Sequence, residues 1–451
     1  MSSQLSTRSV AATLVLVLGA SASRPAIRGG ALGAQTATTP DSAALLRDVA
    51  ALSADAMEGR GSGTPGNDRA AAFIARRFEQ LKLVALVRRG DAATCAADSS
   101  NDMCVPGFLQ PFDARSVMTT HAGPGATGTQ NVVALVRGRD PKLRNQFVII
   151  GAHFDHLGRS PQSAMDPEKG DAIRHGADDN ASGTAMVLEL ARLFKRSPAK
   201  RSIVFVAFSG EELGLLGSKW FVEHSPVTLD SVQAMLNFDM VGRLRDDRLT
   251  VYGVATATEL PALVDSVNTA PALALLAQGD GFGASDHSSF YAKGMPVLHF
   301  FTGIHEEYHR ASDQVALINA GGMAKVAGFA ERVARALADR PARLSAVRAV
   351  ASAPARGARA GTGVYLGSIP DMSAVDVTGV RLMGVRAGSP ADLAGMKEGD
   401  VIVDFDGQPV KDLQTYSDVL FTKKPGDVVT IVVMRAGVRT PLAVTLGKRG
   451  N

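Results

Sequence analysis

The chain has 451 residues, of which 45% are hydrophobic and 20% are charged, so it is long enough to bury a sizeable core and exceeds the usual span of one domain. Its 48 Lys and Arg residues nearly balance its 44 Asp and Glu residues, which leaves a formal net charge of +4. This mild charge is scattered and forms no basic stripe interleaved with aromatic residues, so we expect no nucleic-acid partner.

The first residues have the pattern of a secretory signal peptide. One arginine precedes an apolar run from Val10 to Leu18, and Ala20-Ser21-Ala22 offers a small-residue cleavage site. We expect residues 1–22 to be removed and the protein to be exported to the periplasm or the extracellular space. An N-terminal membrane anchor is the alternative, but the run is too short to span a bilayer comfortably. After cleavage, no integral membrane span is expected.

Cys95 and Cys104 are the only cysteines, and they lie near each other in a polar stretch. An exported chain tolerates a disulfide there, and two unpaired thiols are the alternative. Neither cysteine is near a His or Asp cluster in the sequence, so we do not expect metal binding by thiolate.

Helical patterns and short apolar runs alternate from residue 41 onward. Residues 41–57 and 67–83 carry apolar residues at helical spacing, with Asn67 placed as the N-cap of the second helix. Later runs are too apolar to have a wet face, which predicts strands covered on both sides: 131–136, 146–154, 201–210, 233–242 and 294–303. Helical stretches such as 182–197 separate them. The sequence therefore predicts an α/β fold with a mainly parallel mixed sheet flanked by helices.

The composition changes beyond Asp339. Residues 341–360 are rich in Ala, Arg, Ser and Pro and contain no acidic residue, so we expect a flexible linker there. Residues 361–448 show strand-length runs separated by glycine turns. They predict a second, small and mostly β domain.

Residues of the types that bind metals follow the predicted strands, and ligands of open parallel sheets bind beyond the carboxyl ends of the strands. His153 and Asp155 end one strand and share one side of it, so Asp155 can orient the His153 imidazole. The other strand ends and loops contribute Asp178, Asp179, Glu211, Glu212, Asp239, His305 and His309.

Each of these motifs is weak alone, because a His-x-Asp or Glu-Glu pair is most often a surface feature. Glu211 and Glu212 could also merely cap a helix over residues 213–224, but that alternative does not account for the other positions. Carboxylates gathered at the end of a hydrophobic sheet repel one another and stay protonated unless cations lie between them. We therefore expect bound metal.

In their order along the chain, GAHFDH, GADDNASG, SGEELGLLGS, NFDMVGR and YHRASD resemble the co-catalytic di-zinc exopeptidases related to bacterial secreted aminopeptidases and glutamate carboxypeptidase. The resemblance covers residues 41–338 and implies the zinc exopeptidase fold. In that family the bridging aspartate stands three residues before the Ser of a D-x-x-S-G element. This matching selects Asp179 as the bridging ligand and makes Asp178 a neighbour.

The resemblance also implies the remaining roles. One zinc would be held by Asp179, Glu212 and His309, and the other by His153, Asp179 and Asp239. Glu211 would be the general base, and Tyr308 matches a tyrosine that in some members polarises the scissile carbonyl. His305 competes with His309 for the last ligand position but stands outside the Tyr-His element.

Two divalent cations, three ligand carboxylates and one bridging hydroxide sum to zero charge when both histidines are neutral. Imidazole and carboxylate ligands without thiolate suit two Zn²⁺ per chain, with Co²⁺ or Mn²⁺ as substitutes. Coordination lowers the pKa of the shared water to about 7, and uncoordinated Glu211 can pass its proton to the leaving amine.

We therefore predict an exopeptidase that hydrolyses N-terminal residues from peptide substrates. A carboxypeptidase, a dipeptidase or a glutaminyl cyclase on the same fold is the alternative, whereas a receptor without catalysis is disfavoured because every ligand position is filled. Residues 281–294, with Asp286 and His287, resemble the segment that lines the substrate side in relatives, and a purely structural loop is the other interpretation.

Residues 361–448 resemble a PDZ domain of the type found in bacterial exported proteases. VYLGS, residues 364–368, would be the carboxylate-binding loop, with the terminal carboxylate of a peptide on backbone amides near Leu366 and Gly367. The alternative is a domain that packs on the peptidase and binds nothing.

Overall fold

The computed structural model describes residues 39–87, 107–113, 128–161, 164–279, 281–347, 364–370, 377–386, 388–411 and 413–448. The expected signal peptide and both cysteines lie outside these ranges. Among the helices in these ranges, none combines the length and the apolar character needed to cross a membrane.

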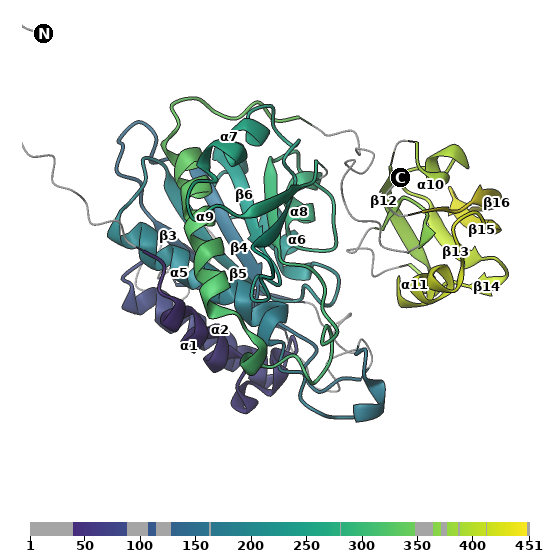
Figure 1. Cartoon of the computed structure of the whole chain (residues 1–451), viewed down its shortest axis with the longest axis horizontal. Helices are drawn as coiled ribbons and strands as arrows, with labels where there is room; N and C mark the ends of the chain where they lie inside the picture. Colours follow the sequence, from purple (N-terminus) through teal and green to yellow (C-terminus); the bar gives the residue numbers. More distant parts are fainter. Residues whose placement is uncertain are drawn as a thin grey trace, which may run out of the picture. The chain divides into compact units, whose positions relative to one another are not determined.

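Within the described ranges, nine strands form the sheet at the centre of the larger part of the chain (Figure 1). Its middle four strands are parallel and adjacent, in the order β5 (Ser202–Phe208), β4 (Phe147–His153), β6 (Val232–Phe238) and β9 (Val297–Phe301). On one side, β3 (Thr129–Val136) pairs antiparallel with β5, and β1 (Val84–Ala85) and β2 (Leu109–Phe112) pair with β3. On the other side follow β7 (Arg248–Tyr252) and β8 (Ala274–Ala277). The predicted α/β fold with a mainly parallel mixed sheet is confirmed.

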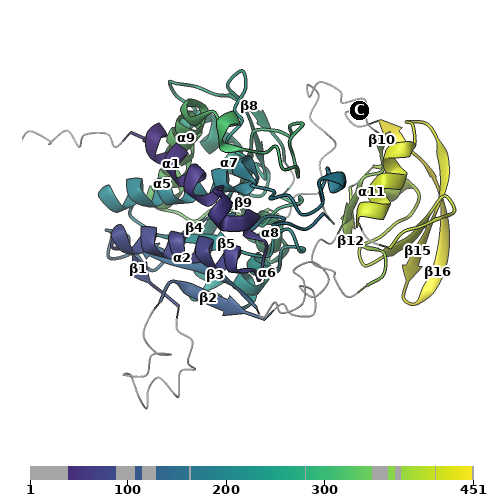
Figure 2. The ribbon, with the colours of Figure 1, turned by 90° about the horizontal axis from the view of Figure 1, so that it is seen from below.

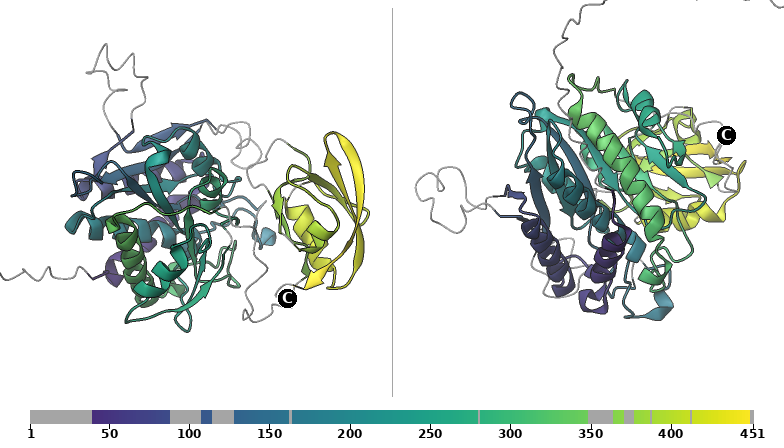
Figure 3. Two further views of the ribbon diagram at one scale, coloured as in Figure 1. Left: turned by 90° about the horizontal axis from the view of Figure 1, so that it is seen from above. Right: turned by 60° about the vertical axis from the view of Figure 1, so that its left-hand side comes forward.

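Helices cover both faces of this sheet, as Figures 2 and 3 show. One face carries α5 (Gly183–Arg196) and α9 (Ala320–Asp339), with α1 (Ser42–Leu52) and α2 (Pro65–Gln80) beside them. The other face carries α6 (Leu216–Glu223) and α8 (His287–Ala292), while α7 (Leu260–Val267) packs on α9. Every residue of β5 is buried, because alternate side chains enter the two layers. Two covered faces explain why the strands have no polar alternation.

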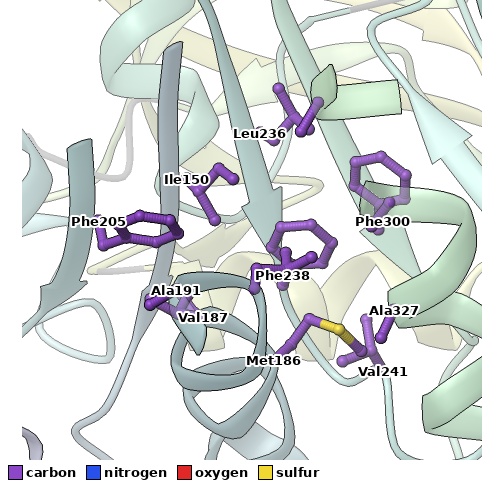
Figure 4. Packing of buried hydrophobic residues seen from close by; sticks show 14 of the residues in the cluster. Ile150, Met186, Val187, Ala191, Phe205, Leu236, Phe238, Val241, Phe300 and Ala327 are labelled. Carbon is purple, nitrogen blue, oxygen red and sulfur yellow. The ribbon is translucent and has the colours of Figure 1, made fainter. Parts of the chain in front are cut away.

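Figure 4 shows the core between the sheet and its helices, where Val187 and Ala191 of α5 lie beside Phe205 of β5 and Ile150 of β4. All four side chains are fully buried. Burial of a side chain such as Ile150, Val187 or Phe205 contributes about 1.5–3 kcal/mol. The packed core therefore provides a rigid base for the loops that follow the strand ends.

The start of α2 differs from the expectation. Asn67 is not the N-cap, because Thr64 occupies that position and its side chain accepts a hydrogen bond from the Asn67 backbone N–H. Pro65 then takes the first helical position, which suits its fixed φ. The Asn67 amide is buried and donates instead to the Arg60 carbonyl and to Ser209 Oγ.

Glu211 and Glu212 do not cap a helix. The helix that follows them, α6, begins at Leu216, after Leu215 in a left-handed conformation, and its first turn contains no acidic residue. Helix capping therefore cannot explain the adjacent pair of glutamates.

The first residues of the expected linker lie along the α/β part of the chain. Ala346 forms a bridge with Ala257, and Arg343 Nη2 donates to the Val232 carbonyl at 2.8 Å. The rest of the expected linker, residues 348–360, lies outside the described residues, and its flexibility stays a prediction.

The C-terminal part is a small antiparallel β domain, as expected, drawn in yellow-green and yellow in Figure 1. Its main sheet contains β11 (Ser368–Pro370), β12 (Val380–Val385), β13 (Val401–Phe405), β14 (Gln408–Pro409), β15 (Val428–Arg435) and β16 (Val438–Thr445). A second pair joins β10 (Val364–Tyr365) to β17 (Gly447–Lys448), and the helices are α10 (Pro390–Leu393) and α11 (Leu413–Thr422). Ile402, Phe405 and Ile431 belong to a hydrophobic core of its own.

Candidate metal centre

The carboxyl ends of β4, β5, β6 and β9 bring the expected ligands together. His153 is the last residue of β4, and Asp239 directly follows β6. Glu212 follows β5, His309 follows β9, and Asp179 lies in the turn before α5. Because the four strands are parallel, residues far apart in the sequence meet at one edge of the sheet.

Asp179 lies between two groups of side chains. Its Oδ1 is 3.5 Å from His153 Nε2, which is also 3.4 Å from Asp239 Oδ1. Its Oδ2 is 3.1 Å from His309 Nε2, which is also 3.2 Å from Glu212 Oε2. One carboxylate therefore presents a different oxygen to each group, an arrangement that suits a carboxylate bridging two cations.

These separations fit metal coordination. Ligand atoms about 2.0–2.1 Å from a tetrahedral Zn²⁺ lie about 3.3 Å from one another. The nitrogen–oxygen distances around Asp179 range from 3.1 to 3.5 Å. Residues of metal-binding types also form two groups, and within each group the possible ligand atoms lie within 4.8 Å of one another. One group is His153, Glu211 and Asp239, and the other is His156, Asp179 and Glu212. The donor set suits two adjacent cations of the zinc type.

The two adjacent glutamates differ in their electrostatic environment. Burial raises the pKa of Glu211 well above its ordinary value, and the charge of Glu212 raises it further. Burial also disfavours the charged form of Glu212, but His309 and His156 hold its pKa well below the ordinary value. Glu211 is therefore suited to carry a proton, and Glu212 is suited to remain an anionic ligand.

The histidines show that the site is built around positive charge. Burial alone would lower the pKa values of His153 and His309, yet both are raised well above 6.5. Glu211 and Asp239 act on His153, and Glu212 and Asp179 act on His309. In the protein without metal, protonated imidazoles would supply the charge that cations supply when bound.

Asp155 lies next to His153 Nδ1, and its expected role in orienting that imidazole stays a prediction. His153 Nδ1 lies 3.2 Å from the Asp155 backbone carbonyl oxygen and 3.7 Å from Oδ1 of the Asp155 carboxylate. That carboxylate accepts hydrogen bonds from Ser62 Oγ at 2.9 Å and from the Glu211 backbone N–H at 3.2 Å. Asp155 thus connects His153 to the loop that carries both glutamates.

Asp178 and His305 form a separate pair beside the two groups. Asp178 Oδ1 accepts a hydrogen bond from the Gly242 N–H at 2.6 Å, and Asp178 Oδ2 lies 3.2 Å from His305 Nε2. His305 therefore lies against Asp178, whereas His309 faces the oxygen pair of Asp179 and Glu212. This geometry favours His309 over His305 as the last ligand.

Tyr308 stacks on the His309 ring, with the ring centroids 3.8 Å apart. Burial, followed by the nearby carboxylates Asp179 and Glu212, raises its pKa well above 10. The phenol therefore keeps its proton and can donate a hydrogen bond. His309 has a φ of 56°, a left-handed conformation that is uncommon outside glycine and often marks functional sites.

Sequence reasoning did not identify Asp313. Its Oδ2 accepts hydrogen bonds from the backbone N–H groups of Asp178 at 2.9 Å and Asp179 at 3.1 Å, and Arg243 Nη2 lies 3.2 Å from Asp313 Oδ1. Asp313 follows His309 by four residues and therefore joins the loops of two expected ligands, Asp179 and His309. Its place at the end of YHRASD was the available indication.

Arg60 was also missed. Its guanidinium is fully buried and donates to the carbonyls of Phe154, His175 and Gly176 at 2.7, 2.7 and 2.8 Å, and to the Leu52 carbonyl. Burial lowers its pKa to about 10, while the charges of Asp179 and Asp155 oppose that change. Arg60 holds the two loops that follow His153 and precede Asp179, and its positive charge offsets part of their negative charge.

The segment 281–294 packs beside this edge of the sheet. Asp286 and His287 are buried, and the His287 ring stacks on His299 at 4.3 Å. Asn237 of β6 donates to Ser285 Oγ and lies 3.1 Å from His299 Nδ1. Burial raises the pKa of Asp286 to about 7, an effect that the charge of His153 opposes. Contact with a substrate stays a prediction for this segment.

Comparisons with known families match both parts of the chain. Residues 131–334 match the Peptidase family M28, and residues 354–446 match the PDZ domain.

Several curated proteins are similar to the larger part. Aminopeptidase YwaD of Bacillus subtilis is 31% identical over 206 residues, which cover 42% of this chain and 41% of that protein. Leucine aminopeptidase 1 of Trichophyton equinum is 33% identical over 181 residues, covering 37% and 45%. The chain thus spans less than half the length of these two relatives.

Solved structures share the fold. A Zn-dependent exopeptidase from Parabacteroides distasonis superposes with a TM-score of 0.51 at 15% identity, covering 67% of this chain and 100% of that chain. A leucine aminopeptidase precursor from Bacteroides thetaiotaomicron gives 0.50 at 14% identity, covering 66% and 98%. At these identities the likeness shows the fold.

The buried His299 predicts a pH dependence of stability. Burial lowers its pKa from 6.5 to about 4, so between these values protons bind the unfolded chain but not the folded one. The stabilising effect of neutral His299 is complete above pH 6.5 and is lost as the pH falls toward 4, by up to about 3 kcal/mol. Urea unfolding of metal-free His299→Gln should therefore show a shallower decline in stability from pH 7 to 4.5 than the parent. If the free energy of unfolding declined equally with pH in His299→Gln and in the parent, His299 would not be the source of the pH dependence.

Proposed function

Since the chain belongs to peptidase family M28 and carries a PDZ domain, we propose that it is a metal-dependent exopeptidase that removes N-terminal residues from peptides. The observation that carries the proposal is the position of Asp179, with one oxygen toward His153 and Asp239 and the other toward His309 and Glu212. The two similar proteins from Bacillus subtilis and Trichophyton equinum are named aminopeptidases, which favours the N-terminal direction.

We assign two zinc ions to this site, and Co²⁺ or Mn²⁺ could substitute. His153, Asp179 and Asp239 would hold one ion, and Asp179, Glu212 and His309 the other. When bound, the ions would polarise the scissile carbonyl and make a water nucleophilic at neutral pH. The chain itself orients these ligands through Asp155, Asp313 and Arg60.

Glu211 would move the proton. It lies within the cluster of His153 and Asp239 but is not needed to complete either set of ligands, and burial favours its protonated form. It would accept a proton from the attacking water and deliver it to the amine of the departing peptide. Tyr308 would donate a hydrogen bond to the carbonyl oxygen, where negative charge develops during the reaction.

For the PDZ domain we propose a peptide ligand with a free C-terminus. β11 lies at the end of the order of strands in its sheet, with β12 as its neighbour, so its other edge can accept an added strand. Before it, a Cβ on Gly367 would lie 2.2 Å from Ser389 Cβ, so only glycine fits this loop. Ser368 Oγ and Tyr416 OH, 2.6 Å apart, join β11 to α11. Backbone amides near Leu366 and Gly367 would receive the carboxylate.

Export is part of the proposal. It rests on the apolar run from Val10 to Leu18 and the small residues that follow it. The substrates would then be peptides of the periplasm or the extracellular medium.

The activity is tested by incubating the purified protein with aminoacyl anilides, blocked dipeptides, free dipeptides and peptides that begin with glutamine, each with added zinc or cobalt. Release of N-terminal residues, abolished by a chelator and restored by metal, is the expected result. Release only from the C-terminus, cleavage of dipeptides alone, or cyclisation of glutamine without hydrolysis would instead establish one of the alternative activities.

Glu211→Gln should keep both metal ions and lose most of its turnover. The amide preserves the shape of the side chain but cannot carry the proton, and a general base of this kind contributes about 10²–10⁴-fold to the rate. Metal content by atomic absorption and kcat on an aminoacyl anilide would be measured together. Near-parental turnover would exclude Glu211 as the base.

Removal of the PDZ domain should affect long peptides selectively. A chain ending at Val347 keeps the contacts of residues 341–347 and should hydrolyse small aminoacyl substrates about as well as the full chain. If the PDZ domain captures free C-termini, truncation should raise the KM for long peptides with a free carboxylate, because capture raises their effective concentration at the metal site. Peptides with an amidated C-terminus are the matched control. Equal KM values for both peptides in both proteins would contradict a capture role.

A further inference from the structure

His156 is a third imidazole at the proposed metal centre, beyond the two expected ligands. It directly follows Asp155, and its side chain is fully buried. We infer that His156 is a positioning residue that holds Glu212 in the orientation required at one of the two metal positions. This inference rests on the proposed function, because it assigns a role relative to the proposed ligands.

The contacts of Glu212 divide between its two oxygens. His156 Nδ1 lies 2.8 Å from Oε1, whereas His309 Nε2 lies 3.2 Å from Oε2. A carboxylate only accepts hydrogen bonds, so His156 Nδ1 carries the hydrogen and donates it. Oε2, the oxygen on the side of His309 and Asp179, stays available for a cation.

His156 Nδ1 is too far from the bridging residue to bond to it, since its distance to Asp179 Oδ2 is 3.8 Å. His156 Nε2 is buried and has no hydrogen-bond partner among the described residues. The hydrogen bond to Glu212 is therefore the polar contact that fixes this ring.

Packing keeps the imidazole in place. Gly176 has a φ of 55°, and a Cβ at that position would lie 2.6 Å from both Cγ and Cδ2 of the His156 ring, so the ring lies directly against the glycine backbone. The edge of the ring also meets His309, with the centroids 5.6 Å apart and an interplanar angle of 73°. The His156 backbone N–H donates to the carbonyl of Arg60.

A ring confined on two sides presents its N–H at a fixed point. Glu212 otherwise has a flexible side chain, which loses conformational freedom when it binds a metal. The hydrogen bond from His156 orders the Glu212 side chain before a cation binds. Less conformational entropy is then lost on binding at the position formed by Asp179, Glu212 and His309. At the other position, formed by His153, Asp179 and Asp239, neither His153 nor Asp239 forms an ion pair with His156 in the described part of the chain.

The test is the affinity of each metal position in the full-length protein. His156→Leu fills a similar volume without a donor, and His156→Asn keeps an amide N–H near the place of Nδ1. His224→Ala is the matched control, since His224 is an exposed imidazole stacked on Trp220 at the end of α6. Zinc stoichiometry would be measured after dialysis, and the two zinc affinities by competition with a chromophoric chelator.

The parent and His224→Ala should bind two zinc ions with the same affinities. His156→Leu should keep one ion at parental affinity and bind the second about 10- to 100-fold more weakly, the usual effect of removing a residue that orients a metal ligand. His156→Asn should recover at least part of this loss. Thermal unfolding of the metal-free proteins checks that each variant folds, and His156→Ala replaces the leucine variant if that variant does not.

Unchanged affinities in His156→Leu would overturn the inference and leave the metal centre intact. Complete loss of the second ion at every zinc concentration, without recovery in His156→Asn, would make His156 a ligand and would also overturn it. A parent protein that binds fewer than two zinc ions would refute the proposed centre itself.

Discussion

The rest of the site is arranged around one electrostatic constraint, the gathering of Asp179, Glu211, Glu212 and Asp239 in a place where little water reaches their charges. Burial disfavours the charged form of each of these carboxyls, and their mutual repulsion adds to that cost. Such a cluster persists only with positive charge in its midst. In the metal-free protein, Arg60 supplies part of this charge, and so do His153 and His309, whose pKa values are raised. Two bound cations would supply the rest, which is why the same cluster that costs stability can provide a catalytic site.

The fold meets this constraint by spreading the proposed ligands over separate strand ends and then joining the loops by hydrogen bonds. Asn180 donates to the Phe238 carbonyl and accepts from the Gly183 N–H, so the Asp179 turn is attached to the end of β6 beside Asp239. Asp313 attaches the same turn to the segment of His309, and Arg60 attaches it to the segment of His153. The apolar core between the sheet and its helices holds the strand ends, and so the hydrogen-bonded loops, in fixed positions. Rigid support of this kind preserves the spacing of the ligands within the narrow range that metal coordination accepts.

Much of the sheet was predictable, because strands such as β5 are buried on both faces and leave an uninterrupted apolar run in the sequence. Strands β7 and β8 were not predicted, since their half-exposed residues give no such run. Acidic residues and histidines after the strands marked the site for a similar reason: parallel strands deliver their ends to one edge. Arg60 and Asp313 were not predicted because they form hydrogen bonds mainly with backbone groups of distant segments. Nearly every residue has these backbone groups, so such contacts leave no recognisable pattern in the sequence. The prediction for Asn67 was wrong because an asparagine near the start of a helix is usually an N-cap, and the sequence does not reveal its long-range hydrogen bond to Ser209.

In the proposed centre Asp179 serves two cations, whereas its neighbour Asp178 only supports the loop. Bound zinc in Asp179→Asn and Asp178→Asn, measured against the parent after equal dialysis, tests this claim most directly. Asp179→Asn should lose both ions, because each group of proposed ligands loses a carboxylate oxygen. Asp178→Asn should retain most of its zinc, because its contacts are with Gly242 and His305. Greater zinc loss in Asp178→Asn than in Asp179→Asn would contradict the account.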